Sequence, residues 1–150
     1  MIFEKNVLSL EETQNLAFAL ARVLGPQDTI TLEGDLGAGK TTFTQALAKG
    51  LGITRTVNSP TFTIMKQYEG RLPFNHLDVY RLEDSDEDLG WEEIFYGEAV
   101  TVVEWAHLIE DDLPDERLAI EIYRVDDHAR KFVFKPIGER YERLCEELLK

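Results

Sequence analysis

The sequence predicts a single α/β domain of the P-loop type, with a mixed, mostly parallel sheet, antiparallel hairpins and flanking helices. Segments rich in β-branched residues alternate with segments of helical periodicity along the chain. A glycine-rich phosphate-binding motif separates one such strand from the helix that follows it. The length of 150 residues suits one sheet covered by helices. We see no internal repeat, low-complexity tract or linker, so we expect one domain over residues 1–150.

Strand-like and helix-like segments alternate from one end of the chain to the other. A capping-box spacing at Ser9 to Glu12, apolar residues at helical spacing and glycines past the ends indicate the helices. β-branched and aromatic content indicates the strands, and two pairs of them are expected to form hairpins. The predicted strands are 2–7, 29–33, 59–68, 72–80, 99–103, 117–125 and 131–137; the predicted helices are 9–24, 41–51, one or two within 83–98, and one after Gly138.

The stretch from Gly34 to Thr41 reads G-D-L-G-A-G-K-T and fits the P-loop pattern. Its glycines let the backbone curl so that successive N–H groups point inward, at the start of a helix whose dipole also favours phosphate. Lys40 would then contact the β- and γ-phosphates, and the Thr41 hydroxyl would ligate Mg²⁺. The alternative is a glycine-rich turn that caps a helix. The residues expected around the phosphates are Asp35, Leu36, Gly37, Ala38, Gly39, Lys40, Thr41 and Thr42.

A P-loop alone binds nucleotide, whereas hydrolysis or transfer needs groups that hold the metal and the attacking oxygen. Thr61, in Ser59-Pro60-Thr61, is a candidate sensor of the γ-phosphate or the metal, although a turn explains Ser-Pro equally well. Asp78 lies within a β-like run and is a candidate Mg²⁺ or water ligand. It is a poor Walker B match because Asn75 and His76 precede it, so a structural ion pair with Arg81 is the alternative.

Glu104 ends the apolar run Ala99 to Val103, which has the composition of a strand buried on both faces. Ligand-binding groups of open α/β sheets gather at the carboxyl ends of parallel strands. Glu104 is therefore the better Walker-B-like candidate, with a surface acid as the alternative. Trp105 would cover the nucleotide or a partner, or pack as a core or rim aromatic. The three histidines do not have the spacing of a metal-ligand set.

The net charge of −13 is concentrated in one part of the chain. Residues 82–121 hold fifteen acidic residues and a single Lys or Arg, Arg117, whereas the rest of the chain is close to neutral. Such a surface should repel nucleic acid, so strong direct binding to nucleic acid is not expected. Segment 82–121 is either a solvated face that keeps the protein soluble or a docking surface for a basic protein partner.

Composition also indicates a cellular location. No apolar run approaches the length of a membrane span, and no basic segment followed by an apolar one opens the chain. One cysteine, Cys145, cannot form an internal disulfide or a site with several thiolates. We therefore expect a cytoplasmic protein without a signal peptide.

Four blocks in this order resemble the bacterial TsaE (YjeE) family: 34–42, 59–63, 76–81 and Glu104-Trp105. The resemblance implies a single α/β P-loop domain and an ATPase that acts with the TsaB and TsaD proteins. Those proteins make the threonylcarbamoyladenosine modification of tRNAs that read codons beginning with A. By this resemblance, ATP hydrolysis resets the TsaB–TsaD assembly between turnovers, and other proteins perform the carbamoyl chemistry.

The resemblance also implies roles for individual residues. The P-loop, Thr41 and Glu104 match the nucleotide and Mg²⁺ positions of the family, while Thr61 and Asp78 match positions associated with hydrolysis. Arg130, in a predicted hairpin turn, matches a region where an arginine approaches the nucleotide, although a basic residue in a turn is commonly just solvated.

Two other classes of function are compatible with a P-loop. A small-molecule kinase would transfer the γ-phosphate to a hydroxyl acceptor, but the sequence shows no arginine-rich lid. A nucleotide-dependent binding module would need only the phosphate cradle. A GTPase is disfavoured because the chain has no Asn-Lys-X-Asp motif for guanine.

Overall fold

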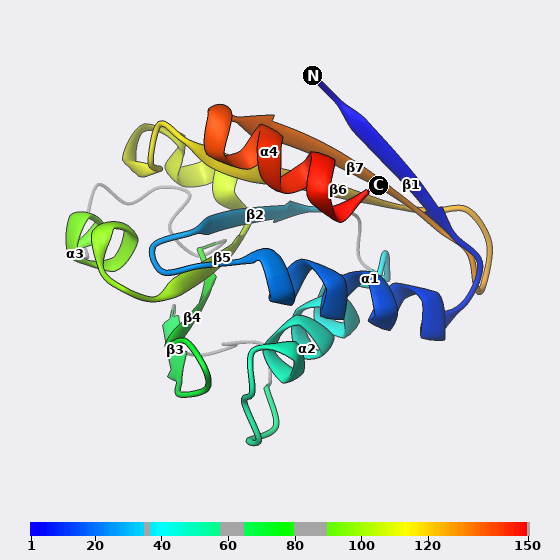
Figure 1. Ribbon diagram of the computed structural model, residues 1–150, viewed down its shortest axis with the longest axis horizontal. Helices are drawn as coiled ribbons and strands as arrows, with labels where there is room; N and C mark the ends of the chain where they lie inside the picture. Colours follow the sequence, from blue (N-terminus) through cyan, green and yellow to red (C-terminus); the bar gives the residue numbers. More distant parts are fainter. Residues whose placement is uncertain (35–36, 58–64, 80–89, 150) are drawn as a thin grey trace.

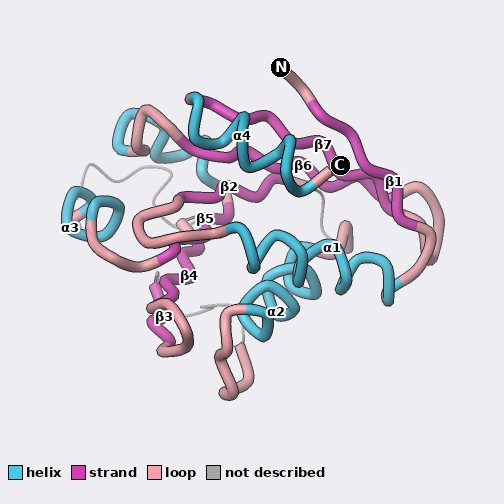
Figure 2. The backbone as a smooth tube through the Cα atoms, in the orientation of Figure 1, coloured by secondary structure: helices cyan, strands magenta, loops and turns pink. Residues whose placement is uncertain are grey.

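The computed structural model describes residues 1–34, 37–57, 65–79 and 90–149, and it contains a seven-stranded sheet with helices packed on it (Figures 1 and 2). The strands lie in the order β1-β7-β6-β2-β5-β4-β3. The strands are β1 (Phe3–Val7), β2 (Thr29–Glu33), β3 (Met65–Tyr68), β4 (Phe74–Asp78), β5 (Val100–Glu104), β6 (Arg117–Arg124) and β7 (Arg130–Ile137). The helices are α1 (Leu10–Val23), α2 (Lys40–Gly50), α3 (Trp91–Tyr96), α4 (Glu139–Leu148) and the 3₁₀ helix η2 (Ala106–Asp112).

The centre of the sheet is parallel and its edges are antiparallel. β2 pairs in parallel with β5 and β6, and β5 pairs in parallel with β4. The hairpins β3–β4 and β6–β7 are antiparallel, as is the pairing of β1 with β7. The predicted mixed sheet with two hairpins is confirmed. Because the four parallel strands are adjacent, their carboxyl ends meet at one edge of the sheet.

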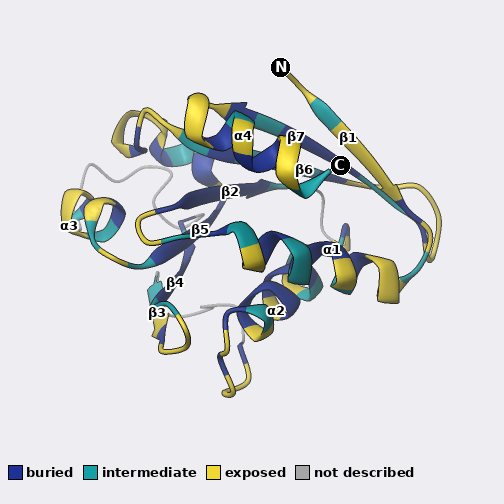
Figure 3. Cartoon of the chain, viewed as in Figure 1, coloured by how far each residue is buried: buried dark blue, intermediate teal, exposed yellow. Residues whose placement is uncertain are grey.

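Two hydrophobic cores lie on opposite faces of the sheet. The larger core joins α1, α2 and α4 to one face through fully buried side chains such as Leu20, Phe43 and Leu32. The smaller core joins α3 and η2 to the other face, where Trp91 and Phe95 stack on each other beside Val103. Figure 3 shows β2 buried along its length, with the exposed side of α1 turned away from the sheet. Burial on both faces explains the mostly apolar sequence of β5, which is buried at every position.

Helix α1 begins where the capping box predicts. The Glu12 backbone N–H donates to Ser9 Oγ at 3.1 Å, and the Glu12 carboxylate accepts from the Leu8 N–H at 3.1 Å. The carboxylate therefore reaches one residue before the cap rather than to the cap's own N–H. The helix ends at Val23, before Gly25-Pro26, as the sequence predicts.

Helix α4 is fixed to the start of β2 by buried polar contacts. The Thr29 backbone N–H donates to the Tyr141 hydroxyl at 2.9 Å, and Arg140 Nη2 lies 2.7 Å from the buried carboxylate of Asp28. The hydrogen bond from Arg140 to Asp28 also raises the pKa of the guanidinium. These contacts fix the end of β2 opposite to the P-loop, so the strand that carries the loop has a defined position.

Several predicted boundaries differ from the structure, chiefly at element ends. The buried strand predicted at 99–103 is β5, Val100–Glu104, so Glu104 lies within the sheet rather than after it. Helix η2, which follows Trp105, was not predicted. The predicted strand 59–68 is described only as β3, and the acidic region 83–98 only from residue 90. Within the described residues, no helix combines the length and apolar content needed to cross a membrane.

Candidate nucleotide-binding site

A cavity of about 770 Å³ lies at the carboxyl edge of the parallel strands. Its walls come from β2, β4, β5 and β6, from the start of α2, and from Arg130 at the start of β7. Its volume falls within the range of small-molecule and cofactor pockets. The cavity is lined by Glu33, Gly34, Gly37, Gly39, Lys40, Thr41, Thr42, Asp78, Glu104, Trp105, Glu121, Ile122, Tyr123 and Arg130.

The described glycines of the P-loop have conformations and neighbours that other residues would not tolerate. Gly37 and Gly39 have φ angles of 84° and 107°, in the left-handed region. A Cβ atom on Gly34 would lie only 2.7 Å from the carbonyl oxygen of Ile122 on β6. The loop therefore leaves β2 in close contact with β6, and α2 begins at Lys40 with its N-terminus at the cavity.

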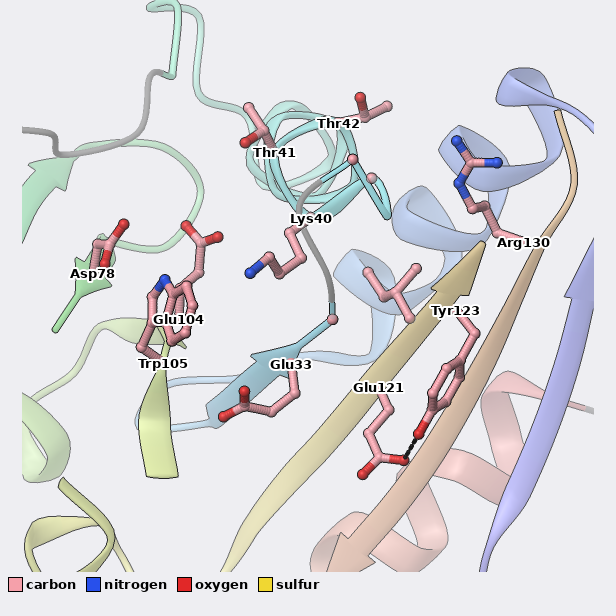
Figure 4. Close-up of a pocket in the computed structure, with 14 residues that line it drawn as sticks. Glu33, Lys40, Thr41, Thr42, Asp78, Glu104, Trp105, Glu121, Tyr123 and Arg130 are labelled. Carbon is pink, nitrogen blue, oxygen red and sulfur yellow. Dashed lines mark hydrogen bonds between the residues drawn. The ribbon is translucent and has the colours of Figure 1, made fainter. Parts of the chain in front are cut away.

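Asp78 and Glu104 occupy the last positions of adjacent strands β4 and β5 and are paired in register. Register partners in parallel strands direct their side chains to the same face of the sheet. Both side chains line the cavity, and Figure 4 shows them side by side, opposite Thr41 at the start of α2. Glu104 is only 4% exposed, so it is not a surface acid. Its Oε2 lies 2.7 Å from Nε2 of His76, a buried histidine of β4.

Lys40 extends into the same cavity, toward Glu104 and Trp105 (Figure 4). Its ammonium lies 5.0 Å from the centroid of the Trp105 ring, within the range of a cation–π contact. Trp105 has a φ angle of 63°, which is unfavourable for a bulky residue, and the residue is 40% exposed. Its strained backbone places the ring at the rim, beside Lys40, rather than in the core.

Arg130 holds the P-loop from the other side of the cavity. Its Nε donates to the carbonyl of Ala38 at 2.9 Å, and its Nη1 donates to the Asp126 carbonyl at 2.7 Å. Asp126 itself orders the β6–β7 turn, because its carboxylate accepts from the backbone of Ala129 and His128, which lowers its pKa. Arg130 is thus attached to the phosphate-binding loop and lines the cavity.

Four residues of the cavity were not predicted from the sequence: Glu33, Glu121, Ile122 and Tyr123. Glu33 and Glu121 are register partners on β2 and β6. Hydrogen bonds from Lys135 and then from Tyr123 lower the pKa of Glu121. Glu33 accepts from the backbone N–H of His107, at 3.3 Å, and so connects β2 to η2. Their positions near the predicted strand ends could have marked them as candidates. Only the strand order, however, shows that they share one cavity with the P-loop.

The structure brings most of the predicted site residues together. Lys40, Thr41, Asp78 and Glu104 line one cavity, as do Gly37, Gly39, Thr42 and Arg130. Ala38 is buried and is connected to the cavity through its carbonyl contact with Arg130. Asp35, Leu36 and Thr61 lie outside the described residues.

The residues present fit Mg²⁺ bound together with a nucleotide. Carboxylate and hydroxyl oxygens from Asp78, Glu104 and Thr41 are hard donors of the kind Mg²⁺ prefers. Among the described residues, no group of three or more His, Cys, Asp or Glu side chains could hold a metal by itself. A cation here would therefore depend on phosphate oxygens as well, which is the usual arrangement for Mg²⁺ in nucleotide sites. The left-handed glycines and Lys40 suit those phosphates.

A mixed sheet with a P-loop and acidic strand ends around one cavity defines the class: an α/β protein of the P-loop type. A model of the family described as threonylcarbamoyl adenosine biosynthesis protein TsaE matches residues 7–132. The chain belongs to the TsaE family.

Individual relatives agree with the family model over nearly the whole chain. The tRNA threonylcarbamoyladenosine biosynthesis protein TsaE of Bacillus subtilis is 60% identical over 139 residues, which are 92% of this chain and 88% of the relative. The protein of the same name from Treponema pallidum is 38% identical over 125 residues, 82% of this chain and 93% of the relative. The crystal structure of Bacillus subtilis YdiB superposes with a TM-score of 0.87 at 50% identity, covering 99% of this chain and 95% of that one.

Proposed function

We propose that this protein is a Mg²⁺-dependent ATPase that works in the biosynthesis of threonylcarbamoyladenosine in tRNA. The names of the TsaE relatives support the pathway. The observation that supports the chemistry is the position of Asp78 and Glu104 opposite the P-loop residues Lys40 and Thr41 in one cavity. A phosphate cradle alone would not require two carboxylates at adjacent strand ends, whereas a hydrolytic site needs groups for the metal and for water.

The proposal assigns a role to each residue of the site, and some roles are shared. Lys40 and the N–H groups at the start of α2 bind the β- and γ-phosphates. Thr41, Glu104 and Asp78 hold Mg²⁺, which when bound neutralises charge that develops on the phosphate oxygens. Glu104, held within the sheet, orders the attacking water, and Thr61 contributes to hydrolysis from the segment after α2. Arg130 keeps the P-loop in place through its contact with the Ala38 carbonyl.

The partners we propose are TsaB and TsaD, and the compartment is the cytoplasm. ATP hydrolysis would reset the TsaB–TsaD assembly between turnovers rather than modify tRNA directly. The described acidic side chains support a protein partner: exposed Glu110, Asp111 and Asp112 lie on η2, which begins directly after Trp105 at the cavity rim. A basic surface docked on these residues would therefore contact the helix that directly follows Trp105.

Phosphate release from ATP, measured for the protein alone and with TsaB and TsaD, tests this proposal. We expect slow Mg²⁺-dependent formation of ADP and phosphate alone, and faster formation with the partners, without any added acceptor. Phosphate transfer that requires a hydroxyl acceptor would identify a kinase instead. Nucleotide binding with no turnover under either condition would identify a binding module and contradict the ATPase.

A further inference from the structure

We infer that His76 is a positioning residue for Glu104: its ring nitrogen Nε2 holds one carboxylate oxygen, so that the other oxygen is available to the cavity. This inference rests on the proposed function, because it gives His76 a role in the Mg²⁺-nucleotide site. His76 does not line the cavity itself. It acts through Glu104, which does.

The contact is short and shielded from solvent. His76 Nε2 lies 2.7 Å from Glu104 Oε2, and the two side chains are 1% and 6% exposed. A buried carboxylate is costly unless it is hydrogen-bonded. In this hydrogen bond we assign His76 Nε2 as the donor and the Glu104 carboxylate oxygen as the acceptor. The bond holds the Oε2 atom of Glu104, whereas His76 does not contact the other carboxylate oxygen, Oε1, by this bond.

The sheet fixes both ends of the contact. Asp78 and Glu104 are register partners, and His76 lies two residues before Asp78 on β4, so His76 is the diagonal neighbour of Glu104 on the same face. The imidazole stacks on Phe74, with ring centroids 6.3 Å apart and an interplanar angle of 23°. A packed ring on an internal strand of the sheet is a rigid support for a carboxylate at a strand end.

The hydrogen bonding of the ring is directed at Glu104. Within the described part of the chain, the buried Nδ1 atom of His76 has no hydrogen-bond partner. An unpaired buried ring nitrogen is uncommon in proteins. The described structure gives the imidazole one hydrogen bond, to the carboxylate that faces the P-loop.

Substitutions that keep or remove the donor test this role. Gln places an N–H at the same number of bonds from Cβ as His Nε2, whereas Asn is too short to reach Glu104 and Leu has no donor. ATP affinity is measured with Mg²⁺ and with EDTA, and kcat is measured with TsaB and TsaD. We expect His76→Leu and His76→Asn to lower kcat by about 10- to 100-fold, with a smaller loss of the Mg²⁺-dependent gain in ATP affinity and with affinity in EDTA unchanged. His76→Gln should recover most of both.

A double-substitution cycle separates positioning from general damage. In a Glu104→Gln background, His76→Leu should cause no further loss, because the group that His76 positions has already been changed. Thr101→Val is the matched control: Thr101 is a buried β5 residue whose Oγ1 has no hydrogen-bond partner in the described structure. It should leave affinity and kcat unchanged. The inference would be overturned if the losses of the two single variants added fully in the double variant. It would also be overturned if His76→Leu lowered ATP affinity equally with Mg²⁺ and with EDTA.

Two further outcomes keep the test decisive. If His76→Leu does not fold, the comparison of Gln with Asn replaces it, and equal behaviour of these two variants would contradict the role of Nε2.

In ¹⁵N NMR of the nucleotide-free protein, His76 should carry a proton on Nε2; a proton on Nδ1 alone would overturn the inference. Absence of ATP hydrolysis by the unmodified protein would contradict only the proposed function, since nucleotide affinity and NMR still test His76.

Discussion

Lys40 lines the cavity at the start of α2, and its ammonium contacts the Trp105 ring at the cavity rim. Replacing it by alanine removes a charge-assisted contact to phosphate, which is worth roughly 1.5 to 3 kcal/mol. We therefore expect Lys40→Ala to weaken ATP binding by about 10- to 100-fold and to abolish turnover. Calorimetric titration with ATP and Mg²⁺ measures the first effect, and phosphate release the second.

Lys49→Ala provides the control for Lys40→Ala, because Lys49 is an exposed lysine at the other end of α2. It removes the same charge from the same helix without touching the cavity. Equal ATP affinity for the two variants would contradict the phosphate-binding role of Lys40.

At the scale of single residues, the sequence predicts those site residues that a motif or a strand end in the local sequence identifies. The spacing of the P-loop identifies Lys40 and Thr41, and the end of an apolar run identifies Glu104. The contact between His76 and Glu104 was not predictable, because it depends on β4 and β5 being neighbours although their paired residues are about 26 positions apart. Glu121 was missed for the same reason: β6 reaches the cavity only because it pairs with β2.

Helix α4 illustrates packing at the scale of an element, and it predicts a dependence of stability on alkaline pH. Burial raises the pKa of the Cys145 thiol to about 11 and that of the Tyr141 hydroxyl to about 12. In the unfolded chain these groups ionise near their usual values of 9.0 and 10.0. The contribution of these two groups to the free energy of unfolding is therefore fully present below about pH 9. It is lost as pH rises toward 12, by roughly 3 kcal/mol for each group.

Urea unfolding at pH 8, 9.5 and 11 measures this loss for the unmodified protein and for Cys145→Ala. The substitution removes the thiol, so the free energy of unfolding should fall less steeply with pH in the variant. A cavity left by the smaller side chain lowers stability by the same amount at every pH and does not affect the comparison. Parallel stability curves for the two proteins would show that Cys145 does not titrate in this way.

Elements were predicted well where periodicity and end signals agree. The Ser9 capping box predicts the start of α1, and the two hairpins were found from β-like runs separated by turns. Helix η2 was not predicted because 3₁₀ turns lack the hydrophobic period of an α-helix. The pairing of β1 with β7 was also not predictable, since it joins opposite ends of the chain.

At the scale of the whole molecule, the unequal distribution of charge suggests where a basic protein partner would dock. Figure 1 shows α3 and the β6–β7 turn at opposite ends of the long axis, and α3 packs with η2 in the smaller core. The acidic residues of α3 and η2 therefore belong to one part of the surface. The sequence leaves two interpretations of this surface open: it docks a partner, or it only keeps the protein soluble.

Charge reversal distinguishes these alternatives. Changing Glu110, Asp111 and Asp112 to lysine should slow association with TsaB and TsaD by about tenfold or more in low salt, because electrostatic steering is lost. The difference should shrink in high salt. Stopped-flow association rates provide the measurement.

A control with the same net charge changes Glu11, Glu146 and Glu147, exposed residues of α1 and α4, to lysine. It should have a much smaller effect on association. If both triple variants associate at the same rate, the acidic η2 surface has no specific docking role and the solvated-face interpretation holds.

The central claim is that Glu104 converts a phosphate cradle into a hydrolytic site, and phosphate release by Glu104→Ala with TsaB and TsaD present tests it most directly. ATP affinity is measured in parallel, and Glu104→Gln, which keeps an acceptor for His76, serves as a companion variant. We expect turnover to fall by about 100-fold or more while ATP affinity changes much less. Hydrolysis by Glu104→Ala at the native rate would contradict the claim.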